Sequence, residues 1–201
     1  MNSVSTFIFD CFGVICHPAV HGWYEENRLR QGYSDEHLPA ILEQFDLGKL
    51  SEDELVDYFL TYEGINSTKE KIREEIDSHL GLDTELASTI KKLKESGFKT
   101  ALLSNGNESF FERKVYQEYP QFKDLFDEIV ISSSVGMVKP NADIYLHTLQ
   151  IVGSRPEESL FIDDRKVNVD AATMLGMNGY VYTTSSAFSD YLKDVGVSLG
   201  R

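Results

Sequence analysis

The sequence predicts an α/β protein built on a parallel sheet, and three observations support this. Five short runs with strand character recur along the chain, and helical segments separate the later ones, as crossover connections require. A block without strands follows the first run. Several runs end in a polar or charged group. At 201 residues the chain has room for one core domain and a small inserted module.

The strands and helices of the core can be assigned in order. The expected strands are Thr6–Phe9, Lys99–Leu103, Glu128–Ile131, Ser159–Ile162 and Gly179–Tyr182. The expected helices of the core are Glu85–Ser96, Ala142–Val152 and Val167–Leu175. A glycine directly follows each helix, and glycine commonly ends helices because it accepts the left-handed conformation.

Residues 17–80 are predicted to form a helical cap. They contain amphipathic segments near 20–30, 35–47, 51–63 and 68–80, and both Ser51–Glu54 and Ser67–Glu70 match a capping box at a helix start. Because the block lies between the first two strands, residues 1–16 and 81–201 remain as the core domain. The cap aromatics are expected to pack its helices together; they are Tyr24, Tyr33, Phe45, Phe59 and Tyr62.

Composition excludes several classes of partner. The formal charge of −14 argues against a nucleic-acid ligand, because phosphate backbones require clustered Lys and Arg. No apolar run approaches the ~20 residues of a membrane-spanning helix, and the N-terminus lacks the features of a signal peptide. The two cysteines suggest no disulfide framework. We therefore expect a cytoplasmic protein, monomeric or homodimeric, without a membrane partner.

Polar side chains follow the first two expected strands. Asp10 closes the apolar run Phe7–Phe9, where a carboxylate is costly to bury and where open α/β sheets bind ligands. Ser104-Asn105-Gly106 follows the second strand and could hydrogen-bond phosphoryl oxygens. Each feature also has a purely structural reading, because Asp10 could cap a helix and Ser, Asn and Gly are ordinary turn residues.

The third and fourth strands lead to charged groups. Lys139 follows the third strand and can stabilise developing negative charge, although most lysines are simply solvated. Asp163 and Asp164 follow the fourth strand, and two adjacent carboxylates repel unless a cation neutralises them. Oxygen ligands of this kind suit Mg²⁺. Because the ends of parallel strands meet at one edge, all these groups should converge.

This ordered set resembles the haloacid dehalogenase-like (HAD) hydrolase superfamily. Asp10 within Phe9–Ile15 matches the first motif of that family and Ser104 the second. Lys139 matches the third motif and Asp163-Asp164 the fourth. The segment around Gly136–Pro140, with Asn168, is similar to the sugar-phosphate phosphatases of the family. The resemblance implies a Rossmann-like three-layer core whose helical cap follows the first strand.

The resemblance also implies a mechanism. Asp10 would be the nucleophile that forms an aspartyl-phosphate. Ser104 and Lys139, together with Asn105 and Gly106, would hold the phosphoryl group of a small phosphorylated metabolite. Mg²⁺ would be bound by Asp10, the backbone carbonyl of Phe12 and Asp164, with Asp163 ligating directly or through a water. Asn168 would orient the metal surroundings.

One position departs from the family pattern. Family phosphatases usually carry a second aspartate two residues after the nucleophile, which protonates the leaving oxygen, whereas this chain has Phe12. Losing general acid catalysis costs about 10²–10⁴-fold, and less for a good leaving group. We therefore expect a phosphatase for sugar-1-phosphates or similarly activated esters. Two alternatives remain open: a 2-haloacid dehalogenase, whose relatives also carry an aromatic residue here, and a non-catalytic binding protein.

Overall fold

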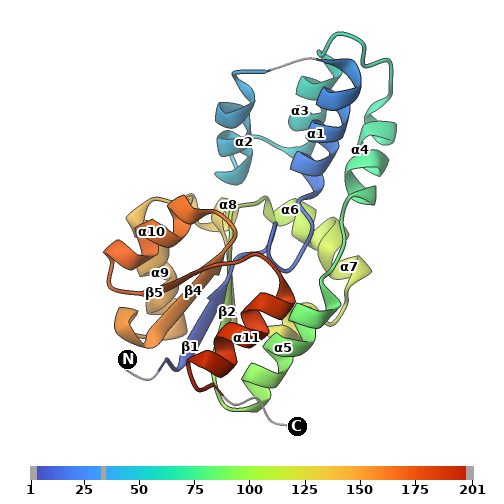
Figure 1. The fold of residues 1–201 in the computed structure, drawn as a ribbon. Coiled ribbons are helices and arrows are strands. Elements are labelled where there is room, and N and C mark those ends of the chain that lie inside the picture. The colour runs from blue at the N-terminus through green and yellow to red at the C-terminus, as the bar shows by residue number, and fades with distance from the viewer. Residues whose placement is uncertain (1–3, 33–34, 198–201) are drawn as a thin grey trace.

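The computed structural model of the protein describes residues 4–32 and 35–197. Five parallel strands form one sheet in the order β3-β2-β1-β4-β5. The strands are β1 (Thr6–Phe9), β2 (Lys99–Ser104), β3 (Glu128–Ile131), β4 (Ser159–Asp163) and β5 (Asn178–Val181). Because β1 lies between β2 and β4, the end of β1 is at the middle of one sheet edge (Figure 1).

Helices cover both faces of the sheet, which gives three layers. Alternation along β1 sends Phe7 and Phe9 to one face and Ile8 to the other, and these residues belong to separate apolar clusters. The first face is covered by α5 (Thr84–Glu95) and α11 (Ser185–Asp194). The second is covered by α9 (Ala142–Val152) and α10 (Lys166–Met174). The predicted α/β parallel-sheet class is confirmed.

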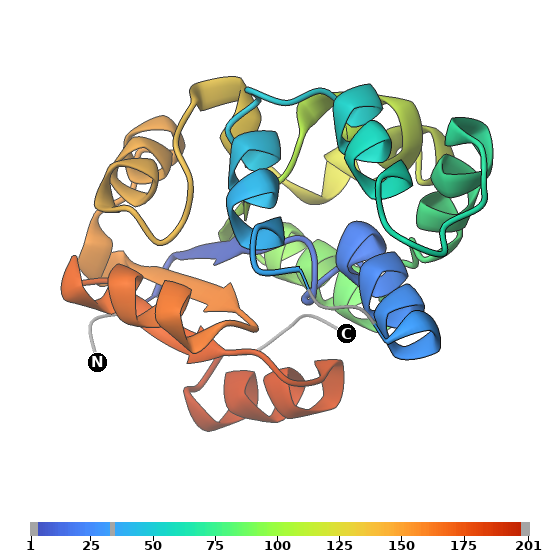
Figure 2. The same ribbon diagram turned by 90° about the horizontal axis from the view of Figure 1, so that it is seen from above.

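Four helices between β1 and β2 form a separate group above the sheet edge (Figure 1). They are α1 (Ala19–Gln31), α2 (Leu38–Asp46), α3 (Glu52–Leu60) and α4 (Lys69–Ser78). Trp23 and Phe59 pack at their centre with ring centroids 4.6 Å apart, and Tyr24 and Phe45 are also buried. Tyr33 lies outside the described residues. Viewed from above (Figure 2), α2 lies close to the ends of the strands.

The helix starts can be compared with the capping signals in the sequence. Ser51 forms the predicted capping box with Glu54. The second predicted start is displaced by one residue, because Thr68 and not Ser67 accepts the hydrogen bond from the N–H of Lys71. The helix α11 was not anticipated, although Thr184 caps it in the same way. Its buried residues Phe188 and Leu192 lie one turn apart, which is the signal that could have predicted it.

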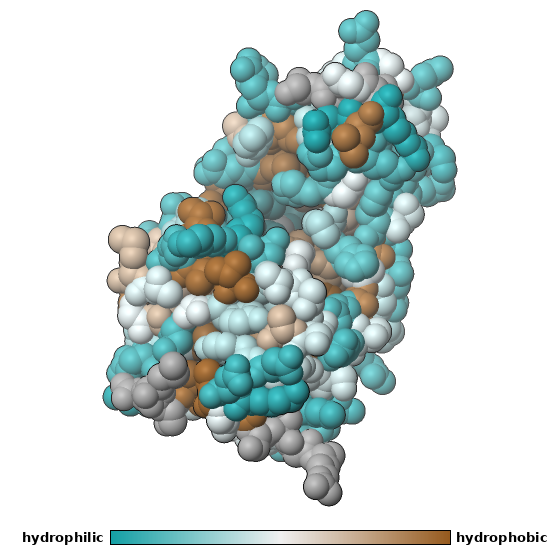
Figure 3. Space-filling view, in the orientation of Figure 1, coloured by the Kyte–Doolittle hydropathy of each residue, from teal (hydrophilic) through white to brown (hydrophobic). Residues whose placement is uncertain are grey.

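Short segments complete the core between these elements. They are α6 (Glu108–Phe110), η1 (Phe111–Val115), α7 (Tyr116–Glu118), η2 (Lys123–Leu125), α8 (Ser132–Val135) and η3 (Pro156–Glu158). The surface in Figure 3 is largely hydrophilic, with apolar residues in small scattered groups. None of the helices in the described part of the chain combines the length and apolar character needed to cross a membrane.

Candidate active site

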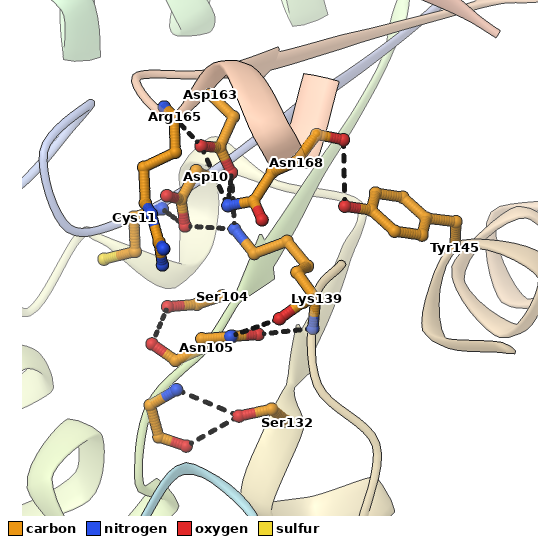
Figure 4. A network of polar contacts seen from close by, with 11 residues as sticks. Asp10, Cys11, Ser104, Asn105, Ser132, Lys139, Tyr145, Asp163, Arg165 and Asn168 are labelled. Carbon is orange, nitrogen blue, oxygen red and sulfur yellow. Dashed lines mark hydrogen bonds and ion pairs between the residues drawn. The ribbon is translucent and has the colours of Figure 1, made fainter. Parts of the chain in front are cut away.

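Three of the predicted charged residues, Asp10, Lys139 and Asp163, lie together at the ends of the strands (Figure 4). Asp10 directly follows β1, and Asp163 is the last residue of β4. The ammonium of Lys139 lies 2.7 Å from Oδ1 of Asp10 and 2.8 Å from Oδ2 of Asp163. All three side chains are almost completely buried. One cation therefore bridges two carboxylates in a site with little access to water.

Asp163 is held by the protein on all sides. Its carboxylate accepts from Lys139, from the backbone N–H of Arg165 at 2.8 Å, and from Nδ2 of Asn168, which lies 3.1 and 3.0 Å from its two oxygens. These contacts occupy about four lone-pair positions, which is all that a carboxylate offers. Asn168 is itself fixed, since its backbone carbonyl accepts from the hydroxyl of Tyr145 at 3.0 Å.

Burial and charge act in opposite directions on this cluster. Burial raises the pKa of Asp10, although Lys139 and the backbone N–H of Cys11 at 2.6 Å stabilise its carboxylate. Burial also tends to lower the pKa of Lys139, but the charges of Asp10 and Asp163 outweigh it and raise that pKa above its usual value. The lysine is therefore positively charged in this site.

Asp164 completes a group of three carboxylates. Oxygen atoms of Asp10, Asp163 and Asp164 lie within 4.8 Å of one another, and Asp164 is the only one of the three that is exposed. Gly13 makes room for it, because a Cβ at that position would lie 2.5 Å from Oδ2 of Asp164. Gly13 also has φ of +94°, a conformation that other residues rarely adopt.

The loop after β2 is fixed against the segment that carries Lys139. The side chain of Asn105 accepts from the backbone N–H of Lys139 at 2.8 Å and donates to its carbonyl at 3.0 Å. Gly106 donates its N–H to Oγ of Ser132 at 2.9 Å. Ser104 is buried, and its hydroxyl donates only a long bond of 3.2 Å to the carbonyl of Asn105. Of these three residues, Ser104 is thus the most free to bind a ligand through its side chain.

Residues that the sequence analysis did not single out connect the four-helix group to the segments that follow β2 and β3. Ser132 follows β3, and its hydroxyl donates to the carbonyl of Asp46 at 2.6 Å. Asn107 donates to the carbonyl of Phe45 at 3.1 Å. Arg113 makes ion pairs with Glu52 and Asp77 at 2.9 and 2.6 Å. Ser132 could have been found by the strand-end rule applied to β3, whereas nothing local in the sequence marks the other contacts.

Phe12 belongs to an aromatic group beside the site. Its ring centroid lies 6.0 Å from that of Phe110 and 5.5 Å from that of Phe111. A Cβ at Gly106 would lie 3.2 Å from the Phe12 ring. The side chain therefore packs against the β2 loop and brings no proton-transfer group to the cluster.

Comparison with known sequences finds a matching protein family and similar proteins. A family model described as a haloacid dehalogenase-like hydrolase matches residues 4–176. The sesquiterpene phosphatase astK of Aspergillus oryzae is 30% identical over 148 residues, which are 72% of this chain and 74% of that protein. The family match thus covers β1 to β4 and all the motif residues, from Asp10 to Asp164.

Solved structures share the fold. The HAD family enzyme bt-2542 of Bacteroides thetaiotaomicron is 21% identical, with a TM-score of 0.78 over 95% of this chain and 99% of that one. A further structure of that enzyme is a complex with magnesium and inorganic phosphate. The L-2-haloacid dehalogenase of Xanthobacter autotrophicus is 18% identical, with a TM-score of 0.63 over 97% of this chain and 84% of that one. At such identities the likeness shows the fold and leaves the reaction open.

Proposed function

Because the chain belongs to the haloacid dehalogenase-like hydrolases, we propose that it is a Mg²⁺-dependent phosphatase that acts on a small phosphorylated metabolite through Asp10. The observation that carries this proposal is the buried Asp10–Lys139–Asp163 cluster with Asp164 at its open side. In the same proposal, residues 17–80 act as a cap over the site.

The donor set fits Mg²⁺. Three carboxylates supply only oxygen, and oxygens that share one Mg²⁺ at about 2.1 Å lie up to about 4.2 Å apart, close to the spacing found here. Among the described residues, no hydrogen bond of the turn after β1 uses the carbonyl of Phe12, which leaves it free to serve as a ligand. Asp10, Asp164 and this carbonyl would hold the ion directly. Asp163, which already binds Lys139 and Asn168, would ligate the ion directly or through a water.

Bound Mg²⁺ would neutralise charge on the phosphoryl group and help to align it. The protein residues then have separate tasks. Asp10 attacks phosphorus and forms the aspartyl-phosphate, which water later hydrolyses. Ser104 and Lys139 hold phosphoryl oxygens, and Asn105 positions Lys139 through its backbone. Asn168 keeps Asp163 oriented toward the lysine.

Phe12 supports a preference for activated substrates. No aspartate is available two residues after the nucleophile to protonate the leaving oxygen, so esters with more acidic leaving groups should react faster. We therefore propose a sugar-1-phosphate, whose anomeric oxygen leaves more readily than a primary alcohol.

A metabolite screen with and without Mg²⁺ tests the proposal. We expect phosphate release from hexose-1-phosphates that exceeds release from hexose-6-phosphates, and loss of both in EDTA. Asp10→Asn should abolish turnover, whereas a non-catalytic binding protein would show none to lose. Chloride release from 2-chloropropionate in EDTA would instead identify a dehalogenase. We regard that reaction as disfavoured because Asp163 and Asp164 would repel a carboxylate substrate.

A further inference from the structure

The C-terminal end of α2 is attached to the loop that contains Ser104. The hydroxyl of Ser132 donates to the carbonyl of Asp46 at 2.6 Å and accepts from the N–H of Gly106 at 2.9 Å. Nδ2 of Asn107 donates to the carbonyl of Phe45 at 3.1 Å. Figures 1 and 2 both place the end of α2 near α8 and the strand ends. The last residue of α2 is thus held beside the proposed phosphate site.

The surroundings of the Asp46 side chain differ from those of an ordinary surface carboxylate. Burial raises its pKa to about 7, although the positive charges of Lys139 and Arg165 oppose the rise. Glu43, on the same helix, adds to the rise. Asp46 is half-buried, and the contacts of Ser132 hold its backbone beside the loop that carries Ser104. A carboxyl group that titrates near neutral pH can both donate and accept a proton.

The loop after β2, to which the end of α2 is attached, also contacts Phe12. A Cβ at Gly106 would lie 3.2 Å from the ring of Phe12, and the backbone of Gly106 is bridged to Asp46 by Ser132. Phe12 and Asp46 therefore both lie beside the loop that follows β2.

We propose that Asp46 of the cap is the general acid and base that Phe12 cannot be. This inference rests on the proposed phosphatase function but not on the preference for activated esters, because an acid in the cap makes that preference smaller than it would be without one. In the first step Asp10 bonds to phosphorus, the bond from phosphorus to the substrate oxygen breaks, and protonated Asp46 gives its proton to that oxygen. In the second step the Asp46 carboxylate takes a proton from the water that attacks the aspartyl-phosphate. Phosphate and free Asp10 are released, and Asp46 is protonated again.

Asp46→Asn tests the proposal, because it removes the titrating group and keeps the carbonyl that Ser132 binds. With hexose-6-phosphate, whose leaving alkoxide needs a proton, kcat/KM should fall about 10²–10⁴-fold. With acetyl phosphate, whose leaving group needs none, the first step should proceed and the second should slow. The phosphorylated protein should then accumulate and be visible by intact mass after acid quench. Glu63→Gln, an exposed acid in the loop after α3, should behave as wild type.

The pH profile gives a second readout. For the wild type, kcat/KM with hexose-6-phosphate should fall as the pH rises through about 7, since the protonated acid is lost, and Asp46→Asn should lack this limb. Asp46→Glu should restore part of the rate. Equal slowing with both substrates and no phosphorylated protein would assign Asp46 a structural role and overturn the inference. Unchanged kinetics of Asp46→Asn would overturn it as well and leave the phosphatase intact. A wild-type protein that releases no phosphate from any ester would overturn both proposals.

Discussion

Replacing Lys139 by methionine should destabilise the protein strongly, because it leaves the buried carboxylates of Asp10 and Asp163 without a counter-ion. The Lys139 side chain is 1% exposed, and its partners Asp10 and Asp163 are 7% and 0% exposed. Breaking one buried ion pair by removing a partner costs about 3–5 kcal/mol. Here one ammonium serves two carboxylates, but protonation of one of them would relieve part of the cost. We therefore expect a loss of about 3–5 kcal/mol near neutral pH, a large share of the ~5–15 kcal/mol typical of a domain.

Urea unfolding followed by circular dichroism measures this loss, with the slope m checked for constancy. Lys166→Met is the matched control: that side chain is 74% exposed and pairs with Asp170 at 2.6 Å on the same helix. Such a pair contributes only about 0.3–0.5 kcal/mol. Adding Asp163→Asn to Lys139→Met removes one of the two unpaired buried carboxylates and should recover part of the lost free energy of unfolding. A loss below ~1 kcal/mol for Lys139→Met would refute the reasoning, since the buried charges would then not depend on the lysine.

Three further outcomes are expected. Gly13→Ala should weaken Mg²⁺ binding at least about 10-fold in calorimetry, because the added Cβ would displace Asp164. Gly97 has a similar φ of +89°, and a Cβ there would meet no atom within 4 Å, so Gly97→Ala should leave the Mg²⁺ affinity unchanged. Arg113→Gln should lower stability in urea by about 1–2 kcal/mol, because it breaks half-exposed ion pairs to both α3 and α4; an unchanged midpoint would contradict this. Asp46→Asn should raise the melting temperature above about pH 7 and have little effect near pH 4. Because the pKa of Asp46 is raised in the folded protein, folding favours the protonated acid. The stability of the wild type therefore falls as the pH rises from 3.8 toward about 7, and the asparagine variant does not lose this stability. A lower melting temperature for Asp46→Asn at high pH would contradict the last expectation.

Chain order and apolar patterning determined most of the core. Strand-like runs predicted all five strands to within one residue at either end, and the residues that follow parallel strands must meet at one edge. The convergence of Asp10 and Lys139 with the two aspartates was therefore readable from the linear sequence. The sequence also showed that Phe12 stands where an acid is usual, because that position is counted along the chain.

Only the tertiary structure separated the tasks of similar residues. Asp163 and Asp164 are equivalent in the sequence, but one is enclosed by Lys139, Asn168 and a backbone N–H while the other is open. Asn105, which the sequence predicts to bind substrate, also fixes the backbone of Lys139. The placement of Asp46 depends on Ser132, 86 residues away in sequence. Such contacts arise when α1–α4 pack onto the sheet edge, and helical periodicity specifies which face of a helix is buried but not which distant loop it meets.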